Sequence, residues 1–409
     1  MPVDLALFKK GNFVIKIKNK QIYLVVLLAL LFQTAYQGNI VLTTLYAVHL
    51  HAHSAFLGVI VALSAVFPML LAIYSGKFTD RIGFKLPLVL GMIGCGSALL
   101  LPFIVHNQLW ILLVSQSLFG LFQIFTIVTI QNLVGALSNS KNYSKNYAIL
   151  SQGTSIGELL GNVMTGFAID HIGYSFTYVF LASLAIISGL VFLFNLVTVP
   201  KYEKKTQVQS EKFIDLLASR NLRKTFITSG IILTGVFLFS FYFPVYGRSI
   251  HLSTSLIGLI LGANTAAYFI IRLVMPRLSA KLSEMHLLGI CLLMSSIGFA
   301  LIPLVKNFYI LAGLSFVMGL GLGCCQPLSM SMAYHFSPKN RTGEVLGLRL
   351  AVNKFAQVAV PIISGPLGGT LGTLPVFWTN AALFIYGGLS MFTPETPDKI
   401  KSEISEKTP

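Results

Sequence analysis

Acidic side chains are scarce in this sequence. Only 13 of its 409 residues are Asp or Glu, and all charged residues together make up 10% of the chain, against about 25% in soluble domains. Hydrophobic residues reach 55%. So few charges cannot solvate the surface of a water-soluble protein of this length. The composition therefore excludes an ordinary soluble protein and predicts an all-α protein that crosses a membrane many times.

Cysteine is also rare, and all four cysteines fall within apolar runs, where they act as small packing residues. They predict neither a disulfide nor a metal site. His49, His51 and His53 alternate in a polar turn, but without acids or cysteines they make metal ligation only a weak alternative. We expect no metal and no cofactor. Walker-type loops and hydrolase triads are missing from the sequence, so it predicts neither an ATP-driven pump nor an enzyme.

Apolar segments long enough to span a bilayer, which takes about 20 residues, recur along the chain. We expect twelve of them, near 22–48, 55–75, 86–105, 109–136, 147–169, 175–199, 225–247, 255–275, 287–305, 308–334, 344–365 and 373–392. The predicted units are an N-terminal segment 1–20, a six-helix bundle 21–199, a linker 200–224, a six-helix bundle 225–393 and a tail 394–409. In the linker, Phe213, Leu216 and Leu217 share one helical face, which predicts a short amphipathic helix at the membrane surface.

The basic residues lie almost entirely on one side of the predicted membrane. If both termini share a side, only Arg248 and Lys306 of the 29 Lys and Arg residues fall in turns on the other side. The positive-inside rule then places both termini and the linker in the cytoplasm and the protein in the inner membrane. The formal charge of +16 follows from this orientation, so we expect no nucleic-acid partner.

The two halves of the chain repeat each other. A constant offset of 200 residues, or 199 near the end of each half, aligns identical residues in several of the predicted helices. The pairs are Tyr46 and Tyr246, His51 and His251, Gly58 and Gly258, Ile60 and Ile260, Gly166 and Gly365, and Gly173 and Gly372. A nearly constant offset over several helices predicts two structurally equivalent halves.

One polar stretch between two apolar segments has a distinctive spacing. It reads Gly76-Lys77-Phe78-Thr79-Asp80-Arg81-Ile82-Gly83-Phe84-Lys85, and we expect a short loop at the membrane surface. Gly76 would let two helices approach closely, and Gly83 would permit a tight turn. Asp80 could accept hydrogen bonds from the amides of a helix N-terminus, while Arg81 holds the loop in the cytoplasm.

This spacing resembles the G-x-x-x-D-R-x-G-x-K signature of the major facilitator superfamily, which lies between its second and third helices. The resemblance implies twelve transmembrane helices in two pseudo-symmetric six-helix bundles, and secondary transport by alternating access. It also implies a conformational gate formed by Gly76, Asp80, Arg81 and Gly83. The second copy of the signature is degraded, because Ala280 stands where the first copy has Asp80.

The resemblance further implies a central cavity between the two bundles. Polar side chains within apolar segments are costly in lipid, so we expect them to face this cavity, although hydrogen bonds between helices explain about half of them equally well. The predicted substrate-binding residues are Gln33, Tyr36, Gln37, Gln123, Asn264, Tyr268, Gln326, Arg349, Asn353 and Lys354. Arg349 and Lys354 favour an anionic solute. For Arg272, extension toward the nearby membrane surface is an even alternative.

Glu158 is the one acid in the middle of a predicted span. It follows Gly153 and Gly157 in a pattern similar to a glycine–proline signature of antiporters in the superfamily, with glutamate in place of proline. Burial disfavours a charged carboxylate, so Glu158 is a candidate proton site, or else a structural partner of Lys354 or Arg272. Gln116 stands where the superfamily's proton-driven exporters carry arginine.

The sequence thus predicts a monomeric secondary transporter in the lipid bilayer. Its partners would be protons and a small organic solute, anionic or amphipathic, which it would export across the inner membrane. An organic-acid importer, a uniporter and a non-transporting membrane receptor are the alternatives.

Overall fold

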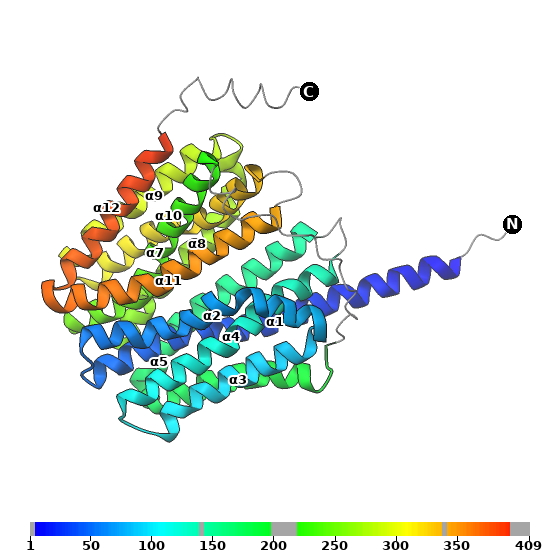
Figure 1. Ribbon diagram of the computed structural model, residues 1–409, viewed down its shortest axis with the longest axis horizontal. Coiled ribbons are helices and arrows are strands. Elements are labelled where there is room, and N and C mark those ends of the chain that lie inside the picture. The colour runs from blue at the N-terminus through cyan, green and yellow to red at the C-terminus, as the bar shows by residue number, and fades with distance from the viewer. Residues whose placement is uncertain (1–4, 139–142, 198–218, 338–341, 393–409) are drawn as a thin grey trace.

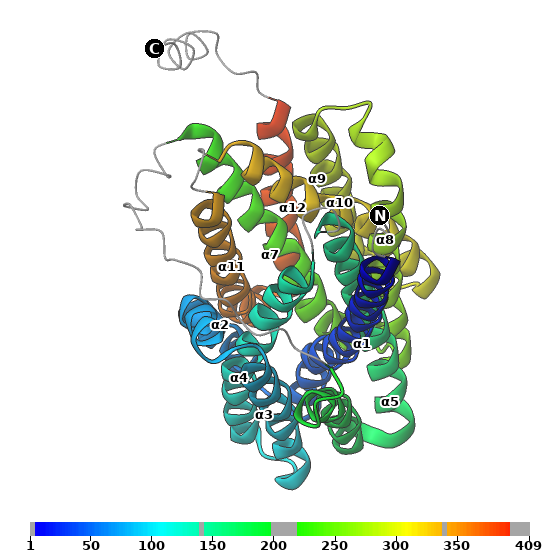
Figure 2. The same cartoon turned by 90° about the vertical axis from the view of Figure 1, so that its right-hand side faces the viewer.

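The computed structural model describes residues 5–138, 143–197, 219–337 and 342–392, and these residues are almost wholly helical. The helices are α1 Leu5–His49, α2 Ser54–Ile82, α3 Lys85–Ile104, α4 Leu109–Leu137, α5 Tyr143–Leu193, α7 Arg220–Ser249, α8 Thr254–Ser279, α9 Glu284–Leu301, η1 Ile302–Leu304, α10 Phe308–His335, α11 Thr342–Leu371 and α12 Thr373–Phe392. Figures 1 and 2 show two groups, α1 to α5 and α7 to α12. Among the described residues, 11 helices are long and apolar enough to cross a membrane.

Helix α5 contains two of the predicted crossings. Its backbone leaves the helical region at Gly173, where φ is 78° and ψ is 172°, a conformation that is essentially restricted to glycine. The residues before and after this kink form separate spans, so the 11 helices make twelve crossings. This confirms the prediction that two segments meet near residue 173. In the second half Gly372, with φ 82°, separates α11 from α12 in the same way.

The repeat is visible in the backbone at one end of the bundle. His51 and His251 both adopt left-handed conformations, with φ 56° and 63°. The next amide in each half, that of Ala52 or Leu252, donates at 2.9 Å to a carbonyl five residues earlier. These are the bonds of a Schellman helix end. We call this the histidine end, and the opposite end, where α2 leads into α3, the basic end.

The prediction of a loop over residues 76–85 is wrong. Helix α2 continues to Ile82 and α3 begins at Lys85, so only Gly83 and Phe84 connect them. No proline interrupts residues 76–82, and one glycine costs a helix only about 1 kcal/mol. A Cβ atom at Gly76 would meet nothing within 4 Å, so this glycine does not serve a close helix contact. Gly83, with φ 89°, does make the turn.

Two further boundaries differ from the prediction. Helix α1 begins at Leu5, within the segment expected to precede the first helix, and α7 begins at Arg220, within the expected linker. Polar residues with good helix propensity can continue a helix beyond the apolar region, so hydropathy marks the crossing rather than the helix end. The amphipathic helix expected around Phe213, Leu216 and Leu217 lies outside the described residues.

Two pairs of helices make the most extensive contacts between the halves, α5 with α8 and α2 with α11, and α1 also contacts α7 (Figure 2). We call these contacts the α5–α8 seam and the α2–α11 seam. Glycines bring the backbones together in both. A Cβ atom at Gly258 would lie 2.6 Å from the Asn162 carbonyl oxygen, and one at Gly365 would lie 2.6 Å from the Ser54 carbonyl oxygen. Small residues permit such close approach between membrane helices.

Candidate functional site

A cavity of about 410 Å³ lies between the two halves. Its walls come from α1 and α5 of the first half and from α7, α8, α10 and α11 of the second. It is lined by Tyr36, Gln37, Ile40, Ser151, Glu158, Leu233, Val236, Phe237, Ser240, Tyr268, Arg272, Leu322, Gln326, Pro327, Met330, Arg349 and Gln357. The volume is within the range of small-molecule sites, about 300–1,000 Å³. We call it the central cavity.

The structure brings several of the predicted site residues together in this cavity. Six of them, from five helices, line it: Tyr36, Gln37, Glu158, Tyr268, Gln326 and Arg349. They come from both halves of the chain, so relative motion of the halves would change their spacing. Their part in binding a solute stays a prediction.

Arg349 supplies a positive charge to the cavity wall. Its side chain is only 5% exposed. One terminal nitrogen, Nη2, donates to the hydroxyl of Ser329 at 2.8 Å and to both oxygens of Gln326, the carbonyl and Oε1, at 3.2 Å. Its Nε is buried without a partner. All of these acceptors are uncharged, so the contacts position the guanidinium without neutralising it.

The part of the cavity wall formed by α5 and α8 combines an acid with a second guanidinium. The half-buried Glu158 accepts a hydrogen bond from Nε2 of Gln33 at 3.3 Å. Arg272, on α8, donates to the hydroxyls of Ser151, at 3.4 Å, and Ser155, both on α5 within two turns before Glu158. Arg272 is therefore a cavity residue that contacts the other half, and its Nε is also buried without a partner.

Three predicted binding residues are engaged in contacts between helices instead. Gln123 donates to the carbonyl of Ser64, Asn264 donates to the carbonyl of Ser315 at 2.8 Å, and Asn353 accepts from the hydroxyl of Ser229 at 2.7 Å. These three are not among the residues that line the central cavity. Their contacts fit the alternative given for polar residues in the apolar segments, which is that they form hydrogen bonds between helices.

Lys354 lies next to a cavity residue, and Gln116 lies within the first half. Lys354 donates through Nζ to Oε1 of Gln357 at 3.0 Å, and Gln357 lines the cavity. Gln116 exchanges hydrogen bonds at 3.0 Å with Asn39 and donates to Thr43 at 2.8 Å. Gln116 therefore ties α4 to α1 inside the first half.

Sequence reasoning missed the serines and the apolar wall. Ser240 accepts from Gln37 at 3.4 Å, which links α7 to α1 across the halves. Leu233, Val236 and Phe237 form the apolar side of the cavity on α7. Serine hydroxyls often satisfy their own helix backbone, and an apolar side chain gives no sign of whether it faces lipid or a cavity. The one sequence feature that could have indicated a cavity residue here is a polar side chain in the middle of a span, such as Ser240.

Three of the predicted gate residues, Gly76, Arg81 and Gly83, lie at the basic end and are not among the described residues that line the cavity. Gly76, Asp80 and Arg81 belong to the last two turns of α2, and Gly83 follows them. Arg81 is exposed. Any influence of Gly76, Arg81 and Gly83 on the cavity must therefore pass through the helices rather than through direct contact.

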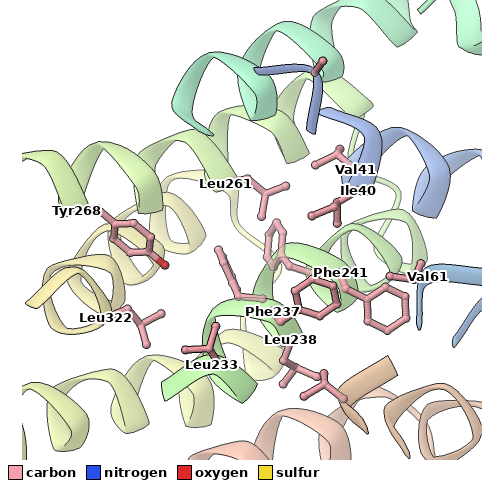
Figure 3. Close-up of a cluster of buried hydrophobic side chains, with 14 of the residues drawn as sticks. Ile40, Val41, Val61, Leu233, Phe237, Leu238, Phe241, Leu261, Tyr268 and Leu322 are labelled. Carbon is pink, nitrogen blue, oxygen red and sulfur yellow. The ribbon is translucent and has the colours of Figure 1, made fainter. Parts of the chain in front are cut away.

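An apolar plug closes the central cavity toward the histidine end. It consists of Ile40, Val41, Val61, Phe237, Leu238, Phe241 and Leu261, all at most 5% exposed. Figure 3 shows these residues meeting from several helices, with the Tyr268 hydroxyl pointing toward Leu322 at one side. Beyond the plug is a second cavity of about 310 Å³, whose lining includes His51, Leu57, Phe241 and Val245.

His49, the last residue of α1, packs with aromatic rings. The ring centroid of His49 lies 4.7 Å from that of Tyr174 and 6.3 Å from that of Tyr46. Within the described part of the chain, no group of three or more His, Cys, Asp or Glu side chains is placed to hold a metal ion.

The chain was compared with known proteins. The family model of the Major Facilitator Superfamily matches residues 23–285 and 225–408. The multidrug resistance protein MdtG of Klebsiella pneumoniae (strain 342) is 23% identical over 338 residues, 81% of this chain and 82% of MdtG. The quinolone resistance protein NorA of Staphylococcus aureus (strain COL) is 24% identical over 325 residues, 76% of this chain and 80% of NorA.

Solved structures share the fold. A POT family transporter in complex with 5-aminolevulinic acid superposes with a TM-score of 0.76 at 15% identity, covering 91% of this chain and 95% of the transporter. Two equivalent halves of membrane-spanning helices form the central cavity between them. This is the architecture of a secondary transporter. The chain belongs to the major facilitator superfamily.

Proposed function

We propose that this protein exports a small amphipathic organic anion across the inner membrane by alternating access, driven by protons. The observation that carries the proposal is Arg349, which lines the central cavity and whose hydrogen-bond partners among the described residues are all uncharged. A carboxylate of the solute would pair with this guanidinium, and its apolar part would lie on Leu233, Val236 and Phe237.

The distribution of charge in the cavity supports a solute with one negative charge. Glu158 and Arg272 lie on the same wall and carry opposite signs, so they offset each other. Arg349 then remains as a positive charge on the cavity wall with no acidic partner among the described residues. A buried cation without an acidic partner is costly, and a monoanion would remove that cost. A dication would meet Arg349 and Arg272 together and be repelled.

The transport cycle would move the two bundles, residues 21–199 and 225–393, against each other. The cavity reaches residues near the basic end, such as Ser151 and Met330, while the apolar plug separates it from the histidine end. We place the basic end in the cytoplasm, which makes this the inward-facing state. The names of two relatives, MdtG and NorA, refer to drug resistance, which supports export.

Glu158 is the proposed proton carrier. It lines the same cavity as Arg272, which belongs to the other half of the chain and donates to Ser155, one turn before Glu158. If the halves moved, the distance between this carboxylate and this guanidinium would change, and with it the preference of Glu158 for a proton. The carboxylate would bind a proton in one state and release it in the other.

The test of the proposal is a ligand-stabilisation screen of the purified protein. Aromatic and aliphatic monocarboxylates should raise its melting temperature, and lipophilic cations should not. The best carboxylate should lose its effect on the Arg349→Gln variant. If lipophilic cations stabilise the protein and monocarboxylates do not, the assignment of an anionic solute is overturned.

A second candidate is import or uniport of an organic acid. Gln116, bound to Asn39 and Thr43 where the superfamily's proton-driven exporters carry arginine, favours it. Reconstituted vesicles with an imposed pH gradient distinguish the two. An antiporter accumulates the solute on the acidic side, an importer coupled to protons accumulates it on the alkaline side, and a uniporter does neither. We expect the protein to act as a monomer in this assay.

A further inference from the structure

A carboxylate from one half of the protein caps a helix of the other half. Asp170, near the end of the first span of α5, reaches the N-terminus of α8. Its Oδ1 accepts from the hydroxyl of Thr254 at 2.5 Å, and its Oδ2 accepts from the amide of Ser255 at 2.7 Å and from the hydroxyl of Ser255 at 2.5 Å. Three hydrogen bonds from two consecutive residues therefore converge on one side chain.

This contact crosses the α5–α8 seam at the histidine end. One turn earlier in α5, the carbonyl oxygen of Gly166 lies 2.9 Å from the same Thr254 hydroxyl oxygen and shares its single hydrogen with Asp170, and Gly166 packs against Gly258. A carboxylate at a helix N-terminus is stabilised by the free amides and by the helix dipole. Separation of the halves at this end must break all of these bonds.

The equivalent position in the other seam has no carboxylate. The offset of 199 residues relates Asp170 to Gly369, and the offset of 200 relates Thr254 to Ser54. These two residues do meet in the α2–α11 seam, where a Cβ atom at Gly369 would lie 3.4 Å from the Ser54 hydroxyl oxygen. The two seams share their helix contact, but the α2–α11 seam has glycine in place of the carboxylate and Ala55 in place of Ser255.

We propose that Asp170 is a one-sided latch that keeps the histidine end closed. Breaking the contacts of the α5–α8 seam then accounts for most of the free energy needed to open this end, and the α2–α11 seam opens more readily. Asp170 does not line the central cavity, so it acts through α8 as a positioning residue and not as a ligand of the solute. The inference rests on the fold and is independent of the solute proposed above.

The test measures access to the second cavity with an engineered cysteine. All four native cysteines are buried, and Val245 lines that cavity, so Val245→Cys is the reporter. The purified protein in lipid nanodiscs is labelled with a charged maleimide, without solute. Asp170→Ala should raise the labelling rate about tenfold, which corresponds to about 1.4 kcal/mol. We expect this lower end of the range for charged hydrogen bonds because Asp170 is exposed to solvent.

A second reporter distinguishes opening of the latch from general loosening. Met330→Cys samples the central cavity on the side of the basic end. In the Asp170→Ala background its labelling should stay the same or fall, because the population moves toward the state closed at that end. A rise at both reporters would mean that the substitution only loosens the fold, and would overturn the proposal. An unchanged rate at Val245→Cys would overturn it as well.

The pseudo-symmetric position offers a transplant of the latch. Gly369→Asp would place a carboxylate against Ser54 in the α2–α11 seam. Combined with Asp170→Ala, it should slow the labelling of Val245→Cys part of the way to the rate of the parent, because Ala55 lacks the hydroxyl that Ser255 donates to Asp170. The matched control is Gly369→Ala, which adds the same Cβ atom without the carboxylate and should leave labelling fast. Equal effects of Gly369→Asp and Gly369→Ala would contradict a role for the carboxylate.

Discussion

At the scale of single residues, Arg349 shows how a membrane protein can hold a charge ready for use. Its three hydrogen bonds to Gln326 and Ser329 fix the guanidinium on the wall of the central cavity. Each acceptor is neutral, so the charge is positioned but not cancelled. Such an arrangement is costly in the empty protein, and the cost is recovered when an anion binds.

The first prediction concerns this arginine. Arg349→Gln should weaken binding of the carboxylate found in the stabilisation screen by about 1.5–3 kcal/mol, the range for hydrogen bonds to charged groups. Isothermal titration calorimetry on the purified variant measures the loss. Arg277→Gln is the matched control, because Arg277 is an exposed cation near the end of α8. Equal losses in both variants would point to long-range charge rather than to contact.

Lys354 should matter less than Arg349. It donates to Gln357 and is not among the residues that line the cavity, so Lys354→Gln should weaken binding of the same carboxylate by less than Arg349→Gln does. A larger loss for Lys354→Gln, measured by the same calorimetry, would assign the anion to the lysine.

The second prediction concerns Glu158. Glu158→Gln mimics the protonated carboxyl, so it should abolish accumulation of solute driven by a pH gradient yet permit exchange of solute down its own gradient. Proton flux and solute uptake in reconstituted vesicles check this together. Glu284→Gln is the control acid, since Glu284 begins α9 and accepts from Ser331 at 2.6 Å. Continued uphill transport by Glu158→Gln would assign the proton to another group.

Gln357 refines this experiment. The offset of 199 residues relates it to Glu158, and it lines the same cavity. Gln357→Ala should therefore change the affinity for the solute while leaving the number of protons moved per solute unchanged. A changed stoichiometry would mean that the neutral amide takes part in proton movement.

At the scale of elements, the end of α2 combines a rigid helix with a minimal turn. Because α2 continues to Ile82, the signature residues form its final two turns, and only Gly83 and Phe84 connect it to α3. A segment of this kind moves as part of a helix and not as a flexible loop. Changes in this segment should therefore act on the exchange between states.

The third prediction tests this role. Asp80→Asn should slow transport while the equilibrium affinity for the solute stays largely intact, because Asp80 belongs to the last two turns of α2, at the basic end. Initial rates in vesicles, set beside calorimetric affinities, separate the two effects. Normal transport by Asp80→Asn would remove this segment from the switching mechanism.

The fourth prediction uses the two glycines of the same segment. Gly83 has φ 89° and ψ −176°, a conformation that costs other residues about 1–3 kcal/mol. Gly83→Ala should lower the melting temperature of the protein. Gly76 is helical with open space at its Cβ position, so Gly76→Ala should leave stability unchanged or raise it by up to about 1 kcal/mol. The reverse order of melting temperatures would contradict this assignment.

At the scale of the whole molecule, the sequence repeat was the most informative predictor. The pairs His51 with His251 and Gly173 with Gly372, identified by a constant offset, have nearly the same φ angles in the structure. Residues at equivalent positions of a repeat form equivalent turns, and equivalent turns require similar φ angles. The repeat in the sequence therefore predicts backbone conformation. The number of crossings could be predicted from hydropathy, since the thickness of the bilayer fixes the minimum length of an apolar helix that spans it.

The composition of the cavity could be predicted only in part. Gln37 and Gln123 are both glutamines in apolar segments, yet one lines the cavity and the other donates to the carbonyl of Ser64. The difference lies in the partner helix, which the sequence of the segment does not contain. Helix ends were missed for a related reason, because α2 continues past the apolar region to a glycine turn.

The apolar plug between the two cavities also has a consequence for the membrane as an insulator. A proton gradient is short-circuited by any continuous file of water molecules, and narrow apolar constrictions interrupt such files by dewetting. The seven plug residues, from Ile40 to Leu261, are almost completely buried. They keep the water of the central cavity apart from that of the second cavity. Many copies of this protein in a membrane would therefore not dissipate the transmembrane potential in the absence of solute.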